Sequence, residues 1–511
     1  MEEEVVNSTL RRVVKGAGIF LVGTFCTLLF GFFTKVLIAR YLTKYDYGVL
    51  SLALTILGIT QTVLTLGIPS AMVRQASYYL GKKDWSGVKK TVSISAFALL
   101  VSGICGFVFI YLSSYYFSII FKAEELEYAL KLLSLSIPFL MLNSYFVSIC
   151  QIFEQVRLKV LVADIARSIL TLSLVVLAVV EKLPFYFLVS VYSIAPAVTF
   201  LIFVTQRSKF RAVGLGLRGT GKYAKELISF AVPLFLQGVL GVIVTWTDVL
   251  MLGYMLTPVD VGMYSAARTL ALLLQQILGA VAFLYFPLVT QLYGQKKLVE
   301  IGRTYAVITK WIMSISLPVF LVMFLFPRAV LWVVYSNKYI GAYVVLELLA
   351  LGFFVHVAFG PNGLTLVSFG DVKFVTAVSA ITALANFVMN LLLIPVFGIN
   401  GAAIATAITY ISSNIIVSVK LFTKYGIHPF SRNYIKPLLA SLFLAVIISR
   451  LCKSVNWLGL ILLFAVFTLA YIAVLLLTKS FDKEDLMLIR AIERRLGLNL
   501  EFLERIFGKF I

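Results

Sequence analysis

Residues 40–51 read RYLTKYDYGVLS, and residues 254–265 read YMLTPVDVGMYS. At an offset of 214 residues the two stretches share five identical positions, which are Leu42/Leu256, Thr43/Thr257, Asp46/Asp260, Gly48/Gly262 and Ser51/Ser265. The same offset also pairs Tyr79 with Tyr293, Lys82 with Lys296 and Lys83 with Lys297. A repeat of this length in an apolar chain predicts two copies of one membrane-embedded unit, from which many transporters build a central path.

The composition indicates an all-α polytopic membrane protein. Of the 511 residues, 61% are hydrophobic and 13% are charged, and the mean hydropathy is +1.00. Soluble domains are about 45–50% apolar and about 25% charged. The acidic start, Glu2 to Glu4, predicts that no signal peptide is removed. The four cysteines are scattered through apolar stretches, and their spacing predicts no metal site.

Apolar runs of membrane-spanning length recur along the chain. A transmembrane helix needs about 20 residues to cross the hydrocarbon core, and only closed helices satisfy their backbone there. We expect about fourteen such helices, at 16–38, 47–69, 91–112, 128–148, 158–180, 184–204, 228–252, 262–288, 309–333, 341–360, 374–394, 400–420, 434–451 and 457–478.

The basic residues predict the orientation. Most of the 44 lysines and arginines fall into loops that share one side with the N-terminus, and cytoplasmic loops carry this excess. We therefore expect both termini in the cytoplasm of a cell membrane, the plasma or inner membrane. The same placement explains the net charge of +21 without a nucleic-acid partner, because the cations flank membrane helices.

Six predicted helices separate the two copies, so both copies cross the membrane in the same direction. This predicts two parallel six-helix lobes, related by an axis along the membrane normal, and two extra C-terminal helices. The expected divisions are an N-terminal lobe (1–210), a basic cytoplasmic linker (211–226), a C-terminal lobe (227–425), the last two helices (426–480) and an amphipathic cytoplasmic tail (481–511).

Two blocks resemble a known superfamily. The first is Ala39-Arg40-Tyr41-Leu42, followed by Gly48 and a helix rich in Leu, Ser and Ala; Gly67-Ile68-Pro69 followed by Arg74 fits the end of that helix. The second block, residues 390–406, reads NLLLIPVFGINGAAIAT and resembles a hairpin of helices 11 and 12. Together with fourteen spans, these blocks resemble the oligosaccharide flippases of polysaccharide biosynthesis in the multidrug/oligosaccharidyl-lipid/polysaccharide (MOP) superfamily.

The resemblance implies two lobes with alternating access. It implies a flippase that moves an oligosaccharide, linked to an isoprenoid phosphate or pyrophosphate, from the cytoplasmic to the outer leaflet. Two alternatives share the fold: an ion-coupled multidrug or small-molecule antiporter, and a lipid II-type flippase. The Ala39 to Leu42 phrase favours the polysaccharide branch over both.

Four cations are candidates for binding the carrier phosphate. A charge inside a span costs about 2.5–3.5 kcal/mol on insertion scales and calls for a reason. In the resembled family helices 1, 2, 7 and 8 line the cleft, and arginine suits phosphate through its bidentate fork. The candidates are Lys35, Arg40, Arg74 and Arg268. The alternatives are snorkelling to the outer interface for Lys35 and Arg40, and a cytoplasmic anchor for Arg74.

Other ionisable residues lie within predicted spans. Asp248 either pairs with a cleft cation or couples transport to Na⁺ or H⁺. Asp164 and Arg167 are three residues apart, which predicts an ion pair on one helical face. Glu347 and His356 are nine apart and so on opposite faces; His356 is expected to be a hydrogen-bonded core histidine more often than a proton relay.

Amide side chains in the spans are candidates for sugar contacts. They are Asn143, Gln237, Gln275, Asn386 and Asn390. The competing interpretation is hydrogen bonding between helices. The repeated Asp46 and Asp260 are expected to cap the helices that follow them.

The chain carries no nucleophile-elbow or P-loop motif. We therefore expect no enzymatic activity, no resident cofactor or metal, and transport coupled to an ion gradient or to use of the flipped lipid. A membrane glycosyltransferase would need a catalytic carboxylate in a large outer loop, and the longest predicted outer loop (113–127) is short. The expected partners are the lipid-linked oligosaccharide and membrane lipid, and the duplication lets a monomer build a complete path.

Overall fold

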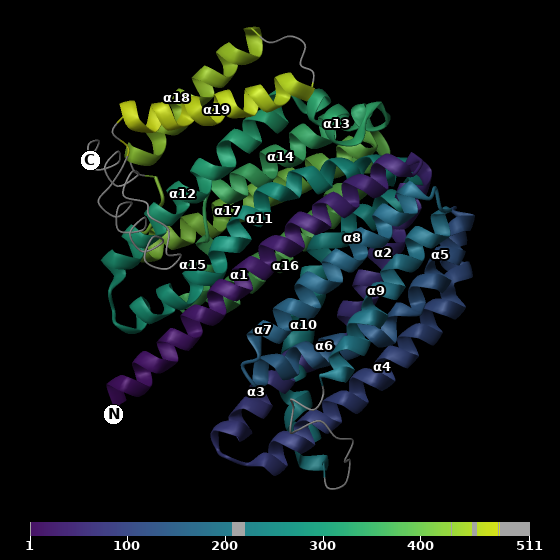
Figure 1. Cartoon of the computed structure of the whole chain (residues 1–511). Helices are drawn as coiled ribbons and strands as arrows, with labels where there is room; N and C mark the ends of the chain where they lie inside the picture. The colour runs from purple at the N-terminus through teal and green to yellow at the C-terminus, as the bar shows by residue number, and fades with distance from the viewer. Residues whose placement is uncertain (1, 207–219, 431, 452–456, 479, 481–511) are drawn as a thin grey trace. The chain divides into compact units, whose positions relative to one another are not determined.

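A computed structural model describes residues 2–206, 220–430, 432–451, 457–478 and 480 of the chain. Every regular element within these ranges is a helix, which confirms the predicted all-α class (Figure 1). Apolar helices satisfy their own backbone, as a lipid environment requires. The predicted amphipathic tail (481–511), and residues 211–219 of the predicted basic linker, lie outside the described residues.

The helices gather into two compact units. The first unit comprises Met1–Ser265 and Asn390–Ile399. Its elements are α1 (Glu2–Tyr41), α2 (Lys44–Thr65), α3 (Ile68–Gly81), α4 (Trp85–Ile120), α5 (Glu124–Ser134), α6 (Ser136–Ile152), α7 (Val156–Lys159), the π-helix η1 (Val160–Ala166), α8 (Arg167–Val180), α9 (Phe185–Thr205) and α10 (Gly221–Met255).

The second unit comprises Ala266–Met389 and Asn400–Ile511. It takes most of α11 (Pro258–Gly294) and α16 (Val372–Phe397). Its other elements are α12 (Leu298–Leu325), α13 (Pro327–Tyr335), the 3₁₀ helix η3 (Asn337–Ala342), α14 (Tyr343–Ala358), α15 (Asn362–Ser368), α17 (Ile399–Tyr425), α18 (Arg432–Leu451) and α19 (Trp457–Leu477). Within it α12 packs against α14 and α19.

The compact units are divided at another place than the predicted lobes, whose boundaries stay a prediction. The sequence predicts a division at the basic linker, with the seventh helix beginning the C-terminal lobe. In the structure α10, which is that helix, belongs to the first unit because it packs against α2 and α3. The packing is close: a Cβ placed on Gly67 would lie 2.4 Å from the carbonyl oxygen of Ala231 in α10.

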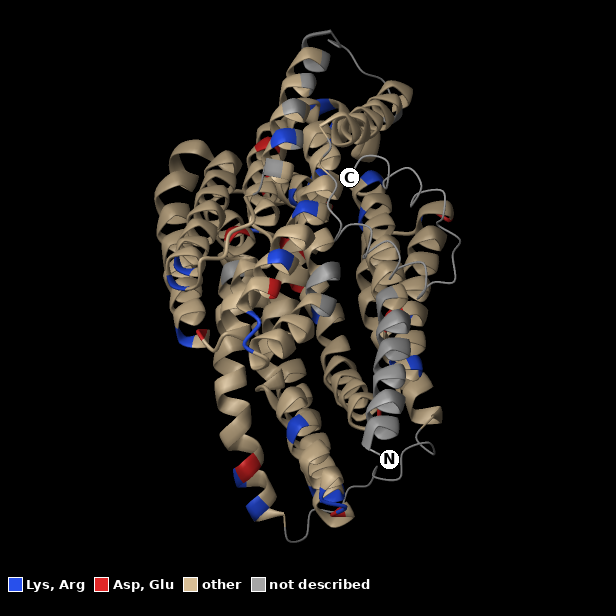
Figure 2. Ribbon diagram, turned by 90° about the vertical axis from the view of Figure 1, so that its left-hand side faces the viewer, with Lys and Arg blue, Asp and Glu red and all other residues tan. Residues whose placement is uncertain are grey.

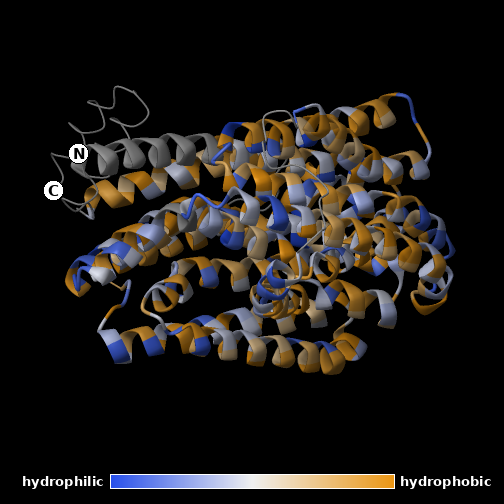
Figure 3. Ribbon diagram, turned by 90° about the horizontal axis from the view of Figure 1, so that it is seen from below, coloured by the Kyte–Doolittle hydropathy of each residue, from blue (hydrophilic) through white to orange (hydrophobic). Residues whose placement is uncertain are grey.

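Length and hydropathy identify 11 candidate membrane spans among the described residues, or up to 12 if the bent pair α5–α6 is one span. The expected count of about fourteen is not confirmed and stays a prediction. Apolar residues cover most of the helical ribbon (Figure 3), and charged residues are sparse along it (Figure 2). This pattern supports a multi-pass membrane protein.

The repeated phrase forms the same local structure twice. Thr43 precedes α2, its Oγ1 accepts from the amide of Asp46 at 3.0 Å, and its hydroxyl donates to that carboxylate at 2.7 Å. At the start of α11, the amide and hydroxyl of Thr257 donate to the Asp260 carboxylate at 3.1 and 2.6 Å. Both copies are capping boxes, in which the threonine is the N-cap and the aspartate is the third helical residue.

A glycine follows each capping box and brings the two helix starts together. A Cβ on Gly48 would lie 1.7 Å from the carbonyl oxygen of Pro258, and one on Gly262 would lie 2.3 Å from the carbonyl oxygen of Lys44. Both contacts fall inside the first unit. Only glycine lets the backbones approach this closely.

Candidate functional site: a polar cavity in the N-terminal unit

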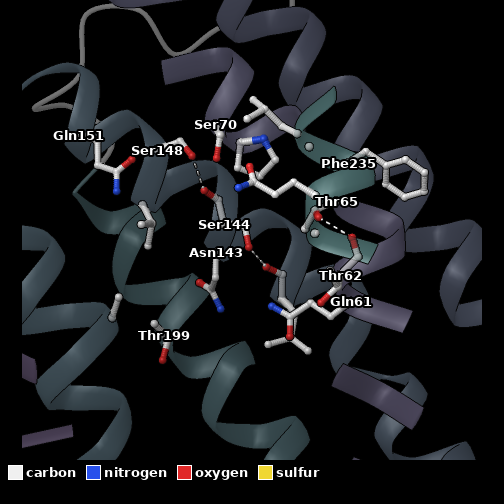
Figure 4. Close-up of a pocket in the computed structure, with 18 of the residues that line it drawn as sticks. Gln61, Thr62, Thr65, Ser70, Asn143, Ser144, Ser148, Gln151, Thr199 and Phe235 are labelled. Atoms are coloured by element: carbon white, nitrogen blue, oxygen red, sulfur yellow. Dashed lines mark hydrogen bonds between the residues drawn. The ribbon is translucent and has the colours of Figure 1, made fainter. Parts of the chain in front are cut away.

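A cavity of about 570 Å³ opens among the helices of the first unit. It is lined by residues of α2, α3, α6, α8, α9 and α10 and of η1. Figure 4 shows Asn143, Ser144, Ser148 and Gln151 of α6 among the side chains that surround it. The volume falls within the range of about 300–1,000 Å³ that is typical of ligand pockets.

A break between α2 and α3 shapes one wall. Leu66 and Gly67 both have positive φ values, 50° and 69°, so the chain leaves one helix and starts another within two residues. No side chain caps the start of α3, and Pro69 lies in its first turn. Gly67, Pro69 and Ser70 all line the cavity. The N-terminal end of a helix carries partial positive charge and free amide donors.

Five hydroxyl groups of the lining bond back to their own helices. The hydroxyl of Thr62 donates to the carbonyl of Gly58 at 3.0 Å, and that of Thr65 to the carbonyl of Thr62 at 2.7 Å. Ser144, Ser148 and Thr199 donate in the same way. Because a hydroxyl oxygen has two lone pairs, each still has acceptor capacity for a ligand.

Other polar side chains of the lining have atoms without a hydrogen-bond partner among the described residues. Asn143 is 5% exposed; its Nδ2 donates to the Pro196 carbonyl at 2.9 Å, while its Oδ1 is unpartnered. The side chains with neither a hydrogen bond nor an ion pair within the described ranges are Gln61, Ser70, Gln151, Arg167 and Gln237. Free amides beside hydroxyls provide the alternating donors and acceptors that a hydroxylated ligand needs.

Arg167 does not form the ion pair predicted for it. The carboxylate of Asp164 pairs with Lys159, at 2.7 Å between Nζ and Oδ2. The prediction assumed α-helical spacing, whereas Asp164 lies in the π-helix η1 and Arg167 is the first residue of α8. The wider turn of a π-helix changes which side chains share a face. Arg167 instead lines the cavity.

Among the described residues, the cavity lining carries one formal charge. This charged residue is Arg167, and none of the described lining residues is an aspartate or a glutamate. An organic cation would meet no carboxylate here, whereas an anionic or neutral hydroxylated group would meet donors and acceptors. The arrangement therefore favours a polar ligand that is neutral or anionic.

The predicted phosphate-binding cations lie outside this cavity. Lys35 and Arg40 are exposed on α1, and Arg268 is partly buried on α11, in the second unit. The sequence predicts that Arg74 ends the second helix; it lies instead in α3, with its guanidinium 3.5 Å above the centre of the Phe230 ring. Their role in binding phosphate stays a prediction.

Asp248 lies in a second polar cluster of the first unit. It is 3% exposed, and its carboxylate accepts from the hydroxyl of Tyr264 at 2.6 Å and from Nδ2 of Asn390 at 2.8 Å. The cluster therefore holds a carboxylate, a phenol and an amide in one buried place.

The remaining candidates lie in the second unit. His356 bonds through Nδ1 to the side chain of Asn414, 3.1 Å from its Oδ1, as expected of a core histidine. Nδ2 of Asn386 donates to the hydroxyl of Thr406 at 3.3 Å, and Nε2 of Gln275 is buried without a hydrogen-bond partner within the described residues. Glu347 lines a cavity of about 530 Å³ with Arg328.

Of the predicted sugar contacts, the structure thus brings two together, Asn143 and Gln237. Arg167 joins them although the sequence predicted a structural role for it. Gln61 and Ser70 also line the cavity. No sequence pattern distinguishes them from other polar residues in or near a span. The only sequence signal near them is Gly67-Ile68-Pro69, which is typical of a helix break.

Comparison with known proteins identifies the family. The sequence model of the polysaccharide biosynthesis protein family matches residues 13–293, more than half of the chain. The chain belongs to this family. The model of the MatE family also matches, over residues 233–392, which agrees with the predicted MOP superfamily.

Two curated relatives are archaeal. An uncharacterized membrane protein of Methanocaldococcus jannaschii is 24% identical over 423 residues, covering 78% of this chain and 82% of the relative. The probable low-salt glycan biosynthesis flippase Agl15 of Haloferax volcanii is 27% identical over 192 residues, covering 37% and 40%.

Solved structures share the fold. The lipid II flippase MurJ in an inward closed conformation has a TM-score of 0.71 at 17% identity, covering 89% of this chain and 98% of that one. An inward-facing multidrug resistance MATE family transporter of the MOP superfamily has a TM-score of 0.65 at 15% identity, covering 80% and 98%. The fold is therefore that of MOP superfamily transporters.

Proposed function

We propose that this protein is a flippase for a lipid-linked oligosaccharide. It carries a glycan on an isoprenoid phosphate or pyrophosphate from the cytoplasmic to the outer leaflet by alternating access. Membership of the polysaccharide biosynthesis family and the similarity to a probable glycan flippase support this function. The proposal includes a plasma or inner membrane location with both termini in the cytoplasm.

The observation that carries the proposal is the chemistry of the cavity in the first unit. Within the part of the chain that the structure describes, its lining offers amides, hydroxyls and one guanidinium, and no carboxylate. Sugars are recognised by such alternating donors and acceptors, whereas organic cations require acidic groups. This composition favours a glycan over the cationic substrate of a multidrug antiporter.

The carrier phosphate is assigned to cations outside the cavity. Lys35, Arg40, Arg74 and Arg268 are the candidates, and the isoprenoid tail stays in lipid throughout. In this proposal the sugar occupies the cavity around Asn143 and Gln237. The same protein acts as a monomer, without enzymatic activity, nucleic-acid partner or resident cofactor.

The buried cluster around Asp248 is proposed to couple transport to a cation. The buried carboxylate of Asp248, beside the phenol of Tyr264 and the amide of Asn390, is an oxygen ligand of the kind that Na⁺ accepts. The same carboxylate is a candidate proton acceptor. A gradient of either ion would drive transport, since the sequence has no nucleotide-binding motif through which ATP hydrolysis could drive it.

A liposome assay tests the function. Purified protein is reconstituted with a fluorescent polyprenyl-diphosphate oligosaccharide, and a membrane-impermeant reductant quenches the outer-leaflet fraction. We expect complete quenching with protein and about half without it. Quenching no faster than in protein-free liposomes, together with efflux of an organic cation such as ethidium, would instead identify an antiporter.

A further inference from the structure

Arg167 is an unusual residue for its surroundings. Among the described residues, it is the one charged residue that lines the cavity, and it has neither an ion pair nor a side-chain hydrogen bond there. The carboxylate nearest to it in sequence, Asp164, is held by Lys159 through both oxygens, at 2.7 and 3.0 Å. A cation kept within a membrane protein costs free energy unless a partner compensates it.

Two further features of the same cavity bear on its ligand. The start of α3 has no side-chain cap, and Ser70, whose backbone amide belongs to that first turn, lines the cavity. Asn143 also lines it; this residue is 95% buried, and its Oδ1 has no hydrogen-bond partner among the described residues. The cavity therefore combines a cationic group with an acceptor that suits a neighbouring hydroxyl.

We propose that this cavity selects a glycan that carries an acidic sugar, and that Arg167 binds its carboxylate. The inference rests on the proposed flippase function and narrows its substrate class. A planar guanidinium matches a carboxylate through two parallel hydrogen bonds. The free amides of Gln61, Gln151 and Gln237 would then contact the hydroxyls of the same or an adjoining sugar.

The carrier phosphate is the other source of negative charge. Phosphate is bonded to the isoprenoid tail, which has to remain in lipid, whereas polar side chains from several helices, among them Gln61, Asn143 and Gln237, line the cavity. The cations proposed above for the phosphate, on α1 and α3, are exposed and lie outside the cavity. A carboxylate on the glycan is therefore the better match for Arg167.

The test compares two probes in the liposome assay. Both are polyprenyl-diphosphate disaccharides with the same fluorophore, one ending in glucuronic acid and the other in glucose. Wild type, Arg167→Gln, Arg167→Lys and Arg157→Gln are measured. Arg157 is an exposed arginine of α7 outside the cavity and serves as the matched control. Thermal unfolding of each purified protein tests whether it is folded.

We expect Arg167→Gln to slow flipping of the glucuronic acid probe about tenfold or more, the effect of losing one charge-assisted hydrogen-bonded pair. Its effect on the glucose probe should be less than about twofold, and Arg167→Lys should recover part of the loss because the charge is restored. Arg157→Gln should leave both rates unchanged.

Equal slowing of both probes by a folded Arg167→Gln protein would overturn the proposal and assign Arg167 to the diphosphate that they share. Unchanged rates for both probes would also overturn it. Failure of the wild type to flip either probe would instead contradict the proposed flippase function. If Arg167→Gln does not fold, competition by glucuronate against glucose for wild-type protein gives the same decision: equal competition overturns the acidic preference.

Discussion

Gly48 and Gly262 lie backbone to backbone: a Cβ built on either glycine would come within 3.1 Å of the amide nitrogen of the other. They occupy the same position in the two copies of the repeated phrase. Each lies in the first turns of a helix, α2 or α11, whose start is fixed by a threonine–aspartate capping box. The duplicated phrase thus forms one reciprocal contact between two helix ends.

Substitution at this contact should destabilise the fold. Alanine at Gly48 or Gly262 would place a methyl group against a backbone carbonyl, 1.7 or 2.3 Å away before relaxation. Overpacking of this kind costs about 1–3 kcal/mol. We expect a lower midpoint of thermal unfolding in detergent for both variants. Gly31→Ala is the matched control, because a Cβ there has no heavy atom within 4 Å; equal midpoints for all three would contradict the reciprocal contact.

Replacing Lys159 should weaken the cavity as an anion site. Lys159 holds the carboxylate of Asp164 at 2.7 Å. In Lys159→Met that carboxylate loses its cation, which leaves an uncompensated negative charge three residues from Arg167 in the chain and makes the neighbourhood of the cavity less favourable to an anion. We expect slower flipping of the glucuronic acid probe and little change for the glucose probe, measured in liposomes. If Lys159→Met slowed both probes equally, the effect would be on the fold rather than on the charge of the cavity.

Asp248→Asn should separate ion coupling from folding. The asparagine can still accept from the hydroxyl of Tyr264, and the amide of Asn390 can rotate to present its oxygen to the new amide nitrogen. Asp248→Ala instead leaves two buried donors without this acceptor, at about 1–3 kcal/mol each. We therefore expect Asn to preserve stability and abolish the dependence of flipping on a Na⁺ or pH gradient.

The measurement is flipping with and without each imposed gradient, alongside thermal unfolding of both Asp248 variants. If the flipping rate of Asp248→Asn still depended on the imposed gradient, this carboxylate would be excluded as the coupling group. Equal loss of stability in both variants would mean that the charge itself, and not the number of acceptors, maintains the cluster.

Asp371 should make stability depend on pH at the acid end. It lies between α15 and α16, where Lys424 donates to its carboxylate at 2.8 Å and the hydroxyl of Tyr425 donates at 2.9 Å. The Lys424 ammonium lowers the pKa of Asp371 below its ordinary value. An unfolded chain has an aspartate pKa of about 3.9. The stabilisation is therefore complete above that pH and is lost as pH falls through the lower folded-state pKa.

Thermal unfolding of wild type and Asp371→Asn across pH 2 to 7 measures this effect. We expect the wild type to be the more stable at neutral pH, by a small margin because Lys424 is half exposed. The difference should shrink toward zero below about pH 4. A difference that grew on acidification would contradict the sign derived from the ion pair.

The sequence predicts the all-helical membrane fold because apolar length and hydropathy report directly on spanning helices. The capping function of Asp46 and Asp260 was also predictable, since the Thr-x-x-Asp spacing recurs in both copies. The sequence does not predict correctly which side chain pairs with Asp164. The rule that residues three apart share a face holds for an α-helix, and only the structure shows that Val160 to Ala166 form a π-helix.

The sequence also does not show which side chains from different helices meet in one cavity. Asn143 and Gln237 are predicted sugar contacts because they are polar residues in apolar spans. The same pattern selects Asn386 and Asn390, but in the structure Asn386 donates to Thr406 and Asn390 donates to Asp248. Which amide faces a cavity depends on how six helices pack, and no local pattern records it. The same holds for α10, whose packing against α2 and α3 places it in the first unit.

The reciprocal glycine contact has a consequence for how the duplicated halves diverge. After a duplication each copy is free to change except where the copies touch one another. Outside the contact the two copies already differ in charge: Arg40 and Lys44 of the first copy align with the uncharged Tyr254 and Pro258 of the second. At Gly48 and Gly262 a larger side chain in one copy collides with the backbone of the other, so neither half can accept it alone. Specialisation of the two halves is therefore confined to positions around a shared point that both must keep.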